Sequence, residues 1–142
     1  MLYKNILVAV DYSNDAGKVL AKALELAKAN SATLHIVHVV EPIDVTGPYD
    51  LAPIMPLELD KQLEQRAQDF LQKLLEQHHA ADVPALVKIG SVKTELFSLV
   101  DELKIDLIVI GTHGRHGVGL ILGSTATSVL HGTPCDVLAV RI

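Results

Sequence analysis

The chain carries an unbroken apolar run, Ile6-Leu7-Val8-Ala9-Val10, which stops at Asp11. A strand with one face in water alternates apolar and polar residues, whereas a strand buried on both faces is apolar throughout. We therefore expect this run to be a strand inside the sheet of an α/β domain. Asp11 then begins the loop at the carboxyl end of that strand.

The same kind of apolar run recurs along the chain, at 33–40, 85–89, 107–110 and 137–142. Segments with helical spacing of apolar residues separate these runs, at 16–30, from about 63 to about 78, at 96–103 and at 123–132. Ser91 or Thr94 is expected to cap the third of these helices. Alternating strands and helices predict a single domain, 1–142, with a doubly wound parallel sheet and helices on both faces.

One segment does not fit this alternation. Four prolines exclude a regular helix between the second apolar run and the helix that follows it: Pro42, Pro48, Pro53 and Pro56. We expect a flexible segment there, with the character of a flap.

The composition excludes several classes of protein. In 142 residues, 49% are hydrophobic, and 12 basic against 17 acidic residues give a net charge of −5. The sequence contains no polybasic run of the kind that binds nucleic acid, and no apolar run is long enough to cross a bilayer. The single Cys135 has no internal partner for a disulfide. These features favour a cytoplasmic protein without nucleic-acid or membrane partners.

Glycines crowd the loop after the fourth apolar run, at Gly111, Gly114, Gly117, Gly119 and then Gly123. Peptide N–H groups without a Cβ beside them can surround an anion. Ser124 and Thr125 add hydroxyl donors, and Arg115 adds a cation. A polyphosphate is the ligand class that this pattern favours. A loop used only for a tight turn is the alternative interpretation.

The sequence indicates binding more strongly than catalysis. Neither Gly-x4-Gly-Lys-Ser/Thr nor an early Gly-x-Gly-x-x-Gly is present. No nucleophile has an evident base, so we predict no catalytic residue and at most slow ATP hydrolysis or self-phosphorylation. His113 and His116 lack a third metal ligand and are expected in solvent. His35 and His38 are expected to be satisfied structural residues on opposite faces of their strand.

Four stretches of the chain resemble the universal stress protein family. They are 3–13, His38-Val39-Val40, 106–114 and 133–140, and they occur in the order of that family. The resemblance implies a Rossmann-like, five-stranded parallel sheet of order 3-2-1-4-5, usually in a homodimer. The ATP-binding branch of the family carries Gly-x2-Gly-x9-Gly-Ser/Thr. Here eight residues, one fewer, separate Gly114 from Gly123.

The resemblance also implies an ATP site. Asp11 would contact the ribose or a Mg²⁺ bound to the phosphates, and Val39 would offer backbone groups to the adenine. The other implied contacts are Ala9 and Val10 at the base, Ile110, Gly111 and Gly114 at the ribose and α-phosphate, and Gly123, Ser124 and Thr125 at the outer phosphates.

The function implied is an ATP-binding regulatory module of the stress response, with a protein partner that the sequence does not identify. One alternative is a dimeric interaction module that binds no nucleotide. A second is an ATP-using enzyme of a related α/β fold, such as an ATP pyrophosphatase or a flavoprotein-type domain. The last apolar run, 137–142, would be an exposed edge strand, and we expect it to pair with its copy in a homodimer.

Overall fold

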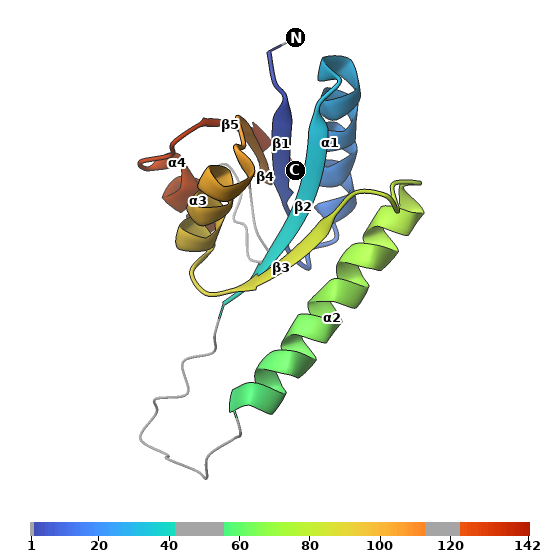
Figure 1. Ribbon diagram of the computed structural model, residues 1–142, viewed down its shortest axis with the longest axis vertical. Helices are drawn as coiled ribbons and strands as arrows, with labels where there is room; N and C mark the ends of the chain where they lie inside the picture. Colours follow the sequence, from blue (N-terminus) through green and yellow to red (C-terminus); the bar gives the residue numbers. More distant parts are fainter. Residues whose placement is uncertain (1, 42–55, 113–122) are drawn as a thin grey trace.

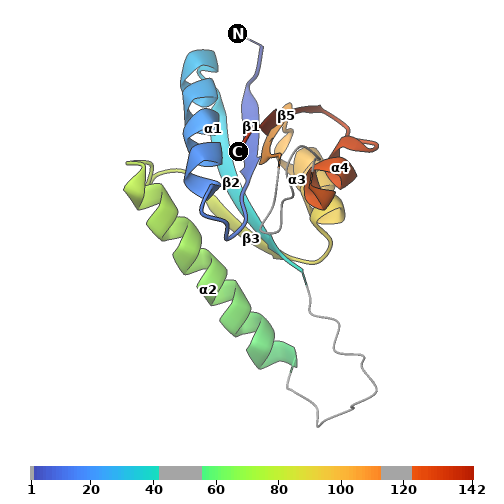
Figure 2. The ribbon, with the colours of Figure 1, turned by 180° about the vertical axis from the view of Figure 1, so that it is seen from behind.

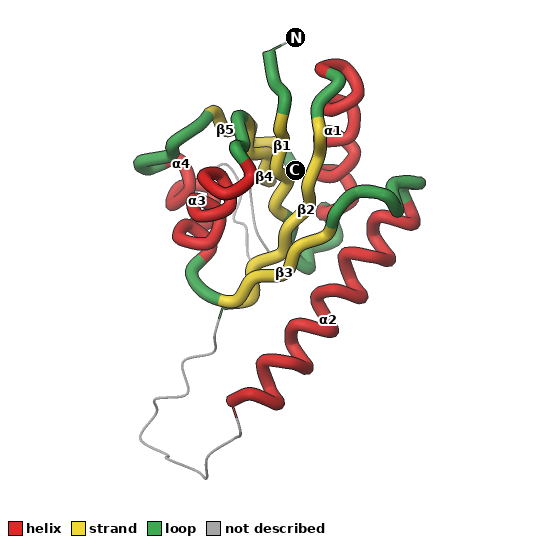
Figure 3. Tube along the Cα trace, in the orientation of Figure 1, coloured by secondary structure: helices red, strands yellow, loops and turns green. Residues whose placement is uncertain are grey.

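The computed structural model describes residues 2–41, 56–112 and 123–142. Strands and helices alternate as the sequence predicts (Figures 1 and 3). In chain order they are β1 (Asn5–Ala9), α1 (Ala16–Asn30), β2 (Thr33–Val40), α2 (Pro56–Gln77), β3 (Ala85–Ile89), α3 (Val92–Leu103), β4 (Leu107–Gly111), α4 (Ser124–Leu130) and β5 (Asp136–Val140). The proline-rich segment lies mostly outside the described residues. Its last proline, Pro56, is the first residue of α2, where a missing N–H costs no helical hydrogen bond.

The strands form one five-stranded parallel sheet in the order β3-β2-β1-β4-β5. The order implied by the family resemblance is therefore confirmed. Residues Asn5 to Ala9 pair with Thr33 to Val37 of β2, and Ile6 to Val8 pair with Leu107 to Val109 of β4. Strand β1 thus lies between two neighbours, as its unbroken apolar sequence predicts.

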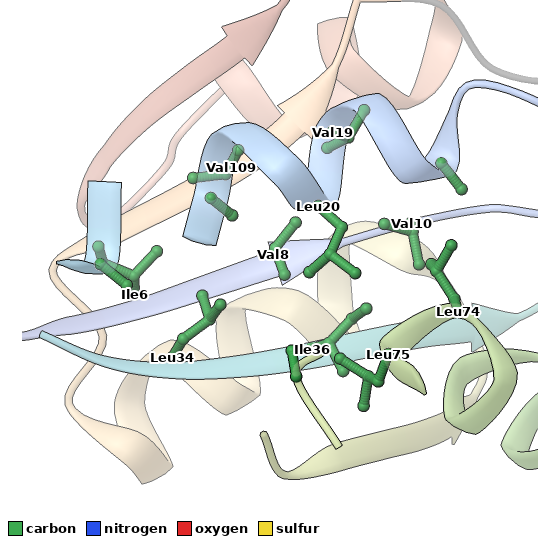
Figure 4. Packing of buried hydrophobic residues seen from close by; sticks show 14 of the residues in the cluster. Ile6, Val8, Val10, Val19, Leu20, Leu34, Ile36, Leu74, Leu75 and Val109 are labelled. Carbon is green, nitrogen blue, oxygen red and sulfur yellow. The ribbon is translucent and has the colours of Figure 1, made fainter. Parts of the chain in front are cut away.

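Helices cover both faces of the sheet. In Figure 1, α1 and α2 lie on one side, and α3 and α4 lie on the other; Figure 2 shows the same two layers from behind. Each layer has its own apolar core, and alternate residues of β1 enter the two cores. Ile6 and Val8 pack with the α1–α2 layer (Figure 4), whereas Leu7 packs with the α3–α4 layer. Burying such a side chain contributes about 1.5–3 kcal/mol to stability.

Local signals place some helix ends correctly, but α2 begins at Pro56, well before the expected start at about residue 63. Helix α1 begins and ends where the sequence predicts, and Ser31 closes it in the left-handed conformation. Ser91 occupies the N-cap position of α3 with extended backbone, as predicted, but its side chain makes no capping hydrogen bond. The alternative cap, Thr94, lies inside the helix. Within the described ranges, no helix is both long and apolar enough to cross a membrane.

The amino end of the sheet is tied together by a side chain that the sequence analysis did not single out. The Asp106 carboxylate accepts hydrogen bonds from the N–H groups of Lys4 and Asn5, at 2.8 and 3.1 Å. The Asp106 N–H donates to the Asn5 carbonyl at 2.9 Å. This one residue therefore sets where β1 enters the sheet beside β4.

Replacing this carboxylate should destabilise the fold. We expect Asp106→Ala to lower the free energy of unfolding by about 1–3 kcal/mol, because the two N–H groups lose a charged acceptor. Urea denaturation of the variant and the wild type measures the difference. Asp101→Ala, at an exposed position on α3, is the control and should change stability by less than about 0.5 kcal/mol. Equal stability of Asp106→Ala and the wild type would contradict this role.

Candidate ligand site at the carboxyl edge of the sheet

The winding of the chain reverses between β1 and β4. Strands β2 and β3 follow on one side of β1, and β5 follows on the far side of β4. Loops at the carboxyl ends of two such strands diverge and leave room for a ligand between them. The predicted site residues on the described loops are brought to this edge: Asp11 after β1, Gly111 at the end of β4, and Gly123 and Ser124 at the start of α4.

The start of α4 is joined directly to the end of β4. The Gly123 N–H donates to the Thr112 carbonyl at 2.7 Å. Ser124 is exposed and Thr125 is partly buried in the first turn of the helix. The predicted residues Gly114 and Arg115 lie outside the described residues, as do His113 and His116.

Asp11 forms a local turn. Its Oδ1 accepts a hydrogen bond from the Ser13 N–H at 2.9 Å, and the Ser13 carbonyl accepts one from the Ala16 N–H at 3.2 Å. Asp15 occupies the N-cap position of α1. Asp11 therefore shapes the loop, and its contact with a ribose or Mg²⁺ stays a prediction.

The side chains at the ends of β1 and β4 face the cores. Val10 is 7% exposed and lies beside Leu74 in the α1–α2 core (Figure 4), and Ile110 is 2% exposed in the other core. Ala9, partly buried, packs on the α3–α4 side. A ligand at this edge would therefore meet the backbone of Val10 and Ile110 more than their side chains.

The peptide groups of Val39 point toward β1 at a place where β1 has ended. In a strand, the peptide groups of alternate residues point to opposite neighbours. The Val37 carbonyl accepts the Val10 N–H at 3.1 Å, so Val39, two residues on, faces the same way. The next bond of a regular ladder would join the Val39 N–H to the Val10 carbonyl. No such bond is found within the described part of the chain.

The Val10 carbonyl instead has a side-chain partner. The Nδ1 atom of His38 lies 2.8 Å from it. A carbonyl oxygen only accepts, so Nδ1 must carry the proton and donate. His38 is 7% exposed, and its ring lies 4.4 Å from that of Tyr12 and 6.2 Å from that of Phe70 on α2. The sequence prediction of a satisfied structural histidine is confirmed for His38.

Tyr12 joins this cluster to the outside of α2. Its ring centroid lies 4.8 Å from that of Phe70 and 5.7 Å from the exposed Arg66 guanidinium. Burial raises the pKa of the Tyr12 phenol, and the positive charge of Arg66 acts in the opposite direction. The sequence analysis missed this cluster, because the apolar periodicity of α2 predicts which side of the helix is buried but not which residues that side contacts.

Two other predictions have clear outcomes. His35 was expected to be satisfied, but its Nδ1 is buried with no hydrogen-bond partner among the described residues, so that prediction is wrong. It fails because the strand turns His35 to the opposite face from His38, away from the Val10 carbonyl. Cys135 is a free, partly buried thiol whose pKa is raised by burial, as suits an unreactive residue. Groups of three or more possible metal ligands are absent from the described residues.

The described structure also has a hollow of about 410 Å³, but at the opposite end of the sheet. It lies between α3 and Pro134, which precede β4 and β5, and Phe97 and Lys104 are among its lining residues. The hollow does not touch the loops at the carboxyl edge. The hollow is therefore separate from the site that the sequence predicts.

The fold and this edge define an open parallel α/β protein of the Rossmann-like class, with polar and glycine-bearing loops at the reversal point. Comparison with known proteins identifies the family. The family model of the universal stress proteins matches residues 2–141, and this chain belongs to that family.

Individual relatives agree over the whole chain. Universal stress protein A homolog 1 of Coxiella burnetii is 41% identical, with 99% of this chain and 97% of the relative covered. The solved structure of UspA from Lactobacillus plantarum is 28% identical and matches with a TM-score of 0.78, with 99% of both chains covered. A universal stress protein solved in complex with cAMP is 25% identical, with a TM-score of 0.67 over 99% of this chain and 98% of that one.

The cation beside Tyr12 gives a testable titration. We expect Arg66→Gln to raise the pKa of Tyr12 further, because the variant removes the positive charge that lowers this pKa and leaves the burial that raises it. NMR of ¹³Cζ-labelled tyrosine as the pH is raised measures the shift. Lys73→Gln, which removes another exposed cation from α2, is the control and should leave the Tyr12 pKa in place. A Tyr12 pKa that does not rise in Arg66→Gln would contradict the contact.

Proposed function

We propose that this universal stress protein binds ATP, together with Mg²⁺, at the carboxyl edge of the sheet and acts as a nucleotide-dependent regulatory module in the cytoplasm. The proposal rests on one observation: the backbone N–H and C=O of Val39 face the end of β1 without the usual ladder partners. An extended residue presents these two groups side by side. They match the Watson–Crick edge of adenine, where N1 accepts and the N6 amino group donates.

The surroundings of Val39 suit the rest of the nucleotide. Asp11 lies at the end of the neighbouring strand, with one carboxylate oxygen on the Ser13 N–H. Across the reversal point, Gly111 and Gly123 lie beside Thr112. Gly123 has φ −63° and ψ 162°, a conformation open to every residue type. A backbone requirement therefore does not explain this glycine, whereas the close approach of a phosphate would.

The relatives support the same ligand class. One similar protein was solved with cAMP, which shares the adenine, the ribose and a phosphate with ATP. The opposite proposal, an interaction module that binds no nucleotide, predicts no effect of any nucleotide on the folded state. An enzyme of a related fold would need a catalytic group that the described residues do not reveal.

The base should be recognised through Val39. We expect Mg-ATP to raise the melting temperature, since a ligand that binds only the folded state stabilises it, by about 2.7 kcal/mol at a hundred times its Kd. Mg-ITP should bind about tenfold more weakly or worse, because inosine places a donor at N1 and an acceptor at O6, the reverse of adenine. Calorimetric titration measures both affinities. Equal binding of ATP and ITP would refute recognition by Val39, and no binding of either would favour the interaction module.

The phosphates should require the glycines. Gly123→Val adds a branched side chain where the phosphates are expected, in a backbone conformation that valine adopts freely, so the fold should persist and Mg-ATP should no longer raise the melting temperature. Gly114→Val is expected to act in the same way. Ser128→Val, at an exposed position on the same helix, is the matched control and should keep the ATP effect. Wild-type affinity in Gly123→Val would mean that the loop serves only as a turn.

We further propose that the protein forms a homodimer through β5, which is the edge strand next to β4. The Val140 carbonyl accepts the Thr112 N–H at 2.9 Å, so the peptide group of Ala139 points the other way, out of the sheet. Val137, Leu138 and Ala139 are only partly buried in the single chain. An antiparallel copy of β5 would satisfy the outward peptide groups and cover these side chains.

Ala139→Pro tests this interface without disturbing the sheet. The substitution deletes an N–H that points outward and spares the bonds to β4, and proline is tolerated at such an edge position. We expect a dimer for the wild type at micromolar concentration and a monomer for the variant, by light scattering. A monomeric wild type would refute the interface.

A further inference from the structure

The end of β1 differs from a regular parallel strand at one atom. The Val10 N–H remains in the ladder, bound to the Val37 carbonyl at 3.1 Å. The Val10 carbonyl does not continue the ladder to the Val39 N–H, and the His38 Nδ1–H donates to it at 2.8 Å instead. His38 directly precedes Val39 in β2. The His38 side chain therefore binds the same carbonyl that the Val39 N–H would bind in a regular ladder.

We propose that His38 is a positioning residue: by holding the Val10 carbonyl out of the ladder, it keeps the peptide group of Val39 available to the base of the nucleotide. This inference rests on the proposed nucleotide binding and names the residue that prepares the site for it. His38 does not itself touch the base, because it projects to the α1–α2 side, where it contacts Phe70.

Packing holds the imidazole in the position that this role requires. Tyr12 lies against the ring at a centroid distance of 4.4 Å with the planes tilted by 47°, and Phe70 lies on the α2 side at 6.2 Å. Tyr12 follows Asp11 directly, so the ring that orients His38 belongs to the same turn as the predicted ribose contact. His38 is 7% exposed, so water has little access to replace its hydrogen bond.

The structure also explains why the alternative state is accessible. Strands β1 and β2 pair through Ala9 and Val37, and the Val39 N–H already faces β1. If the His38 donor were removed, the Val10 carbonyl would be left without a partner in a buried place. The nearest way to satisfy it is to form the missing ladder bond with the Val39 N–H. That bond would occupy the Val39 N–H, which the base is expected to bind.

The experiment compares three variants. His38→Phe keeps a flat ring and removes the donor, whereas His38→Asn keeps an N–H donor close to the position of Nδ1. His35→Phe is the matched control: the same substitution in the same strand, on the opposite face, at a ring whose Nδ1 has no partner among the described residues. Three quantities are measured: the hydrogen exchange of the Val39 amide, the NMR coupling across a hydrogen bond from the Val39 N to the Val10 carbonyl carbon, and the Kd for Mg-ATP.

We expect His38→Phe to slow exchange of the Val39 amide, to show the coupling to Val10, and to weaken ATP binding about tenfold or more. His38→Asn and His35→Phe should keep rapid exchange and an ATP affinity within about threefold of the wild type. If His38 only stabilised the fold, the exchange rate of the Val39 amide would not change selectively. The phenylalanine and asparagine variants would then not differ in this rate. If His38→Phe does not fold, His38→Leu takes its place, because it is smaller and likewise carries no donor for the Val10 carbonyl.

Each other result decides against the inference. Unchanged Val39 exchange in the donor-less variant would show that His38 does not hold the ladder open. A Val39 N–H bonded to the Val10 carbonyl, together with an unchanged ATP affinity, would show that the nucleotide does not bind this N–H. A wild type that binds no adenine nucleotide would refute the proposed function, and the assignment of His38 to the site with it, while the exchange data would still report separately on the ladder.

Discussion

The pairing of β1 between β2 and β4 is the constraint on which the other parts of this protein depend. Its side chains alternate between two cores, with Ile6 and Val8 on one face and Leu7 on the other, all without measurable exposure. No polar residue can occupy such positions without an unpaired buried group. The two helical layers must therefore both cover β1, and the chain must reverse its winding beside it. The candidate ligand site lies at the edge of the sheet where that reversal occurs.

The direction of individual peptide groups then decides which parts of the sheet remain available for binding. A parallel ladder consumes both groups of every second residue on each side. On the described strands, peptide groups are left over along the outer edges of β3 and β5 and at Val39 beyond the end of β1. The proposed dimer uses the outward groups of β5, centred on Ala139, and the proposed nucleotide site uses those of Val39. Both proposals therefore rest on backbone groups more than on side chains.

The sequence predicted the architecture well because burial dictates residue type. The bounds of α1, β2 and β3 match the expected ones, and the other apolar runs all became strands. Errors lie at the ends: β1 and β5 each begin one residue before the predicted start, and β5 ends at Val140 rather than Ile142. An apolar run records which residues are buried, whereas a strand ends where its hydrogen-bonding neighbour ends. The family resemblance supplied the strand order, which composition and periodicity do not contain.

For the candidate site, too, the sequence and the tertiary structure decided different features. The sequence by itself determined its place, since Asp11, Gly111 and Gly123 follow from where apolar runs stop and glycines begin. Only the tertiary structure decided what these loops surround. His38 meets Val10, 28 residues away, through a strand register, and Tyr12 meets Phe70 through the path of α2. A local pattern states which side of an element is buried. Which atom lies opposite a given donor depends on the mutual position of elements distant in sequence, and packing of the complete chain sets that position.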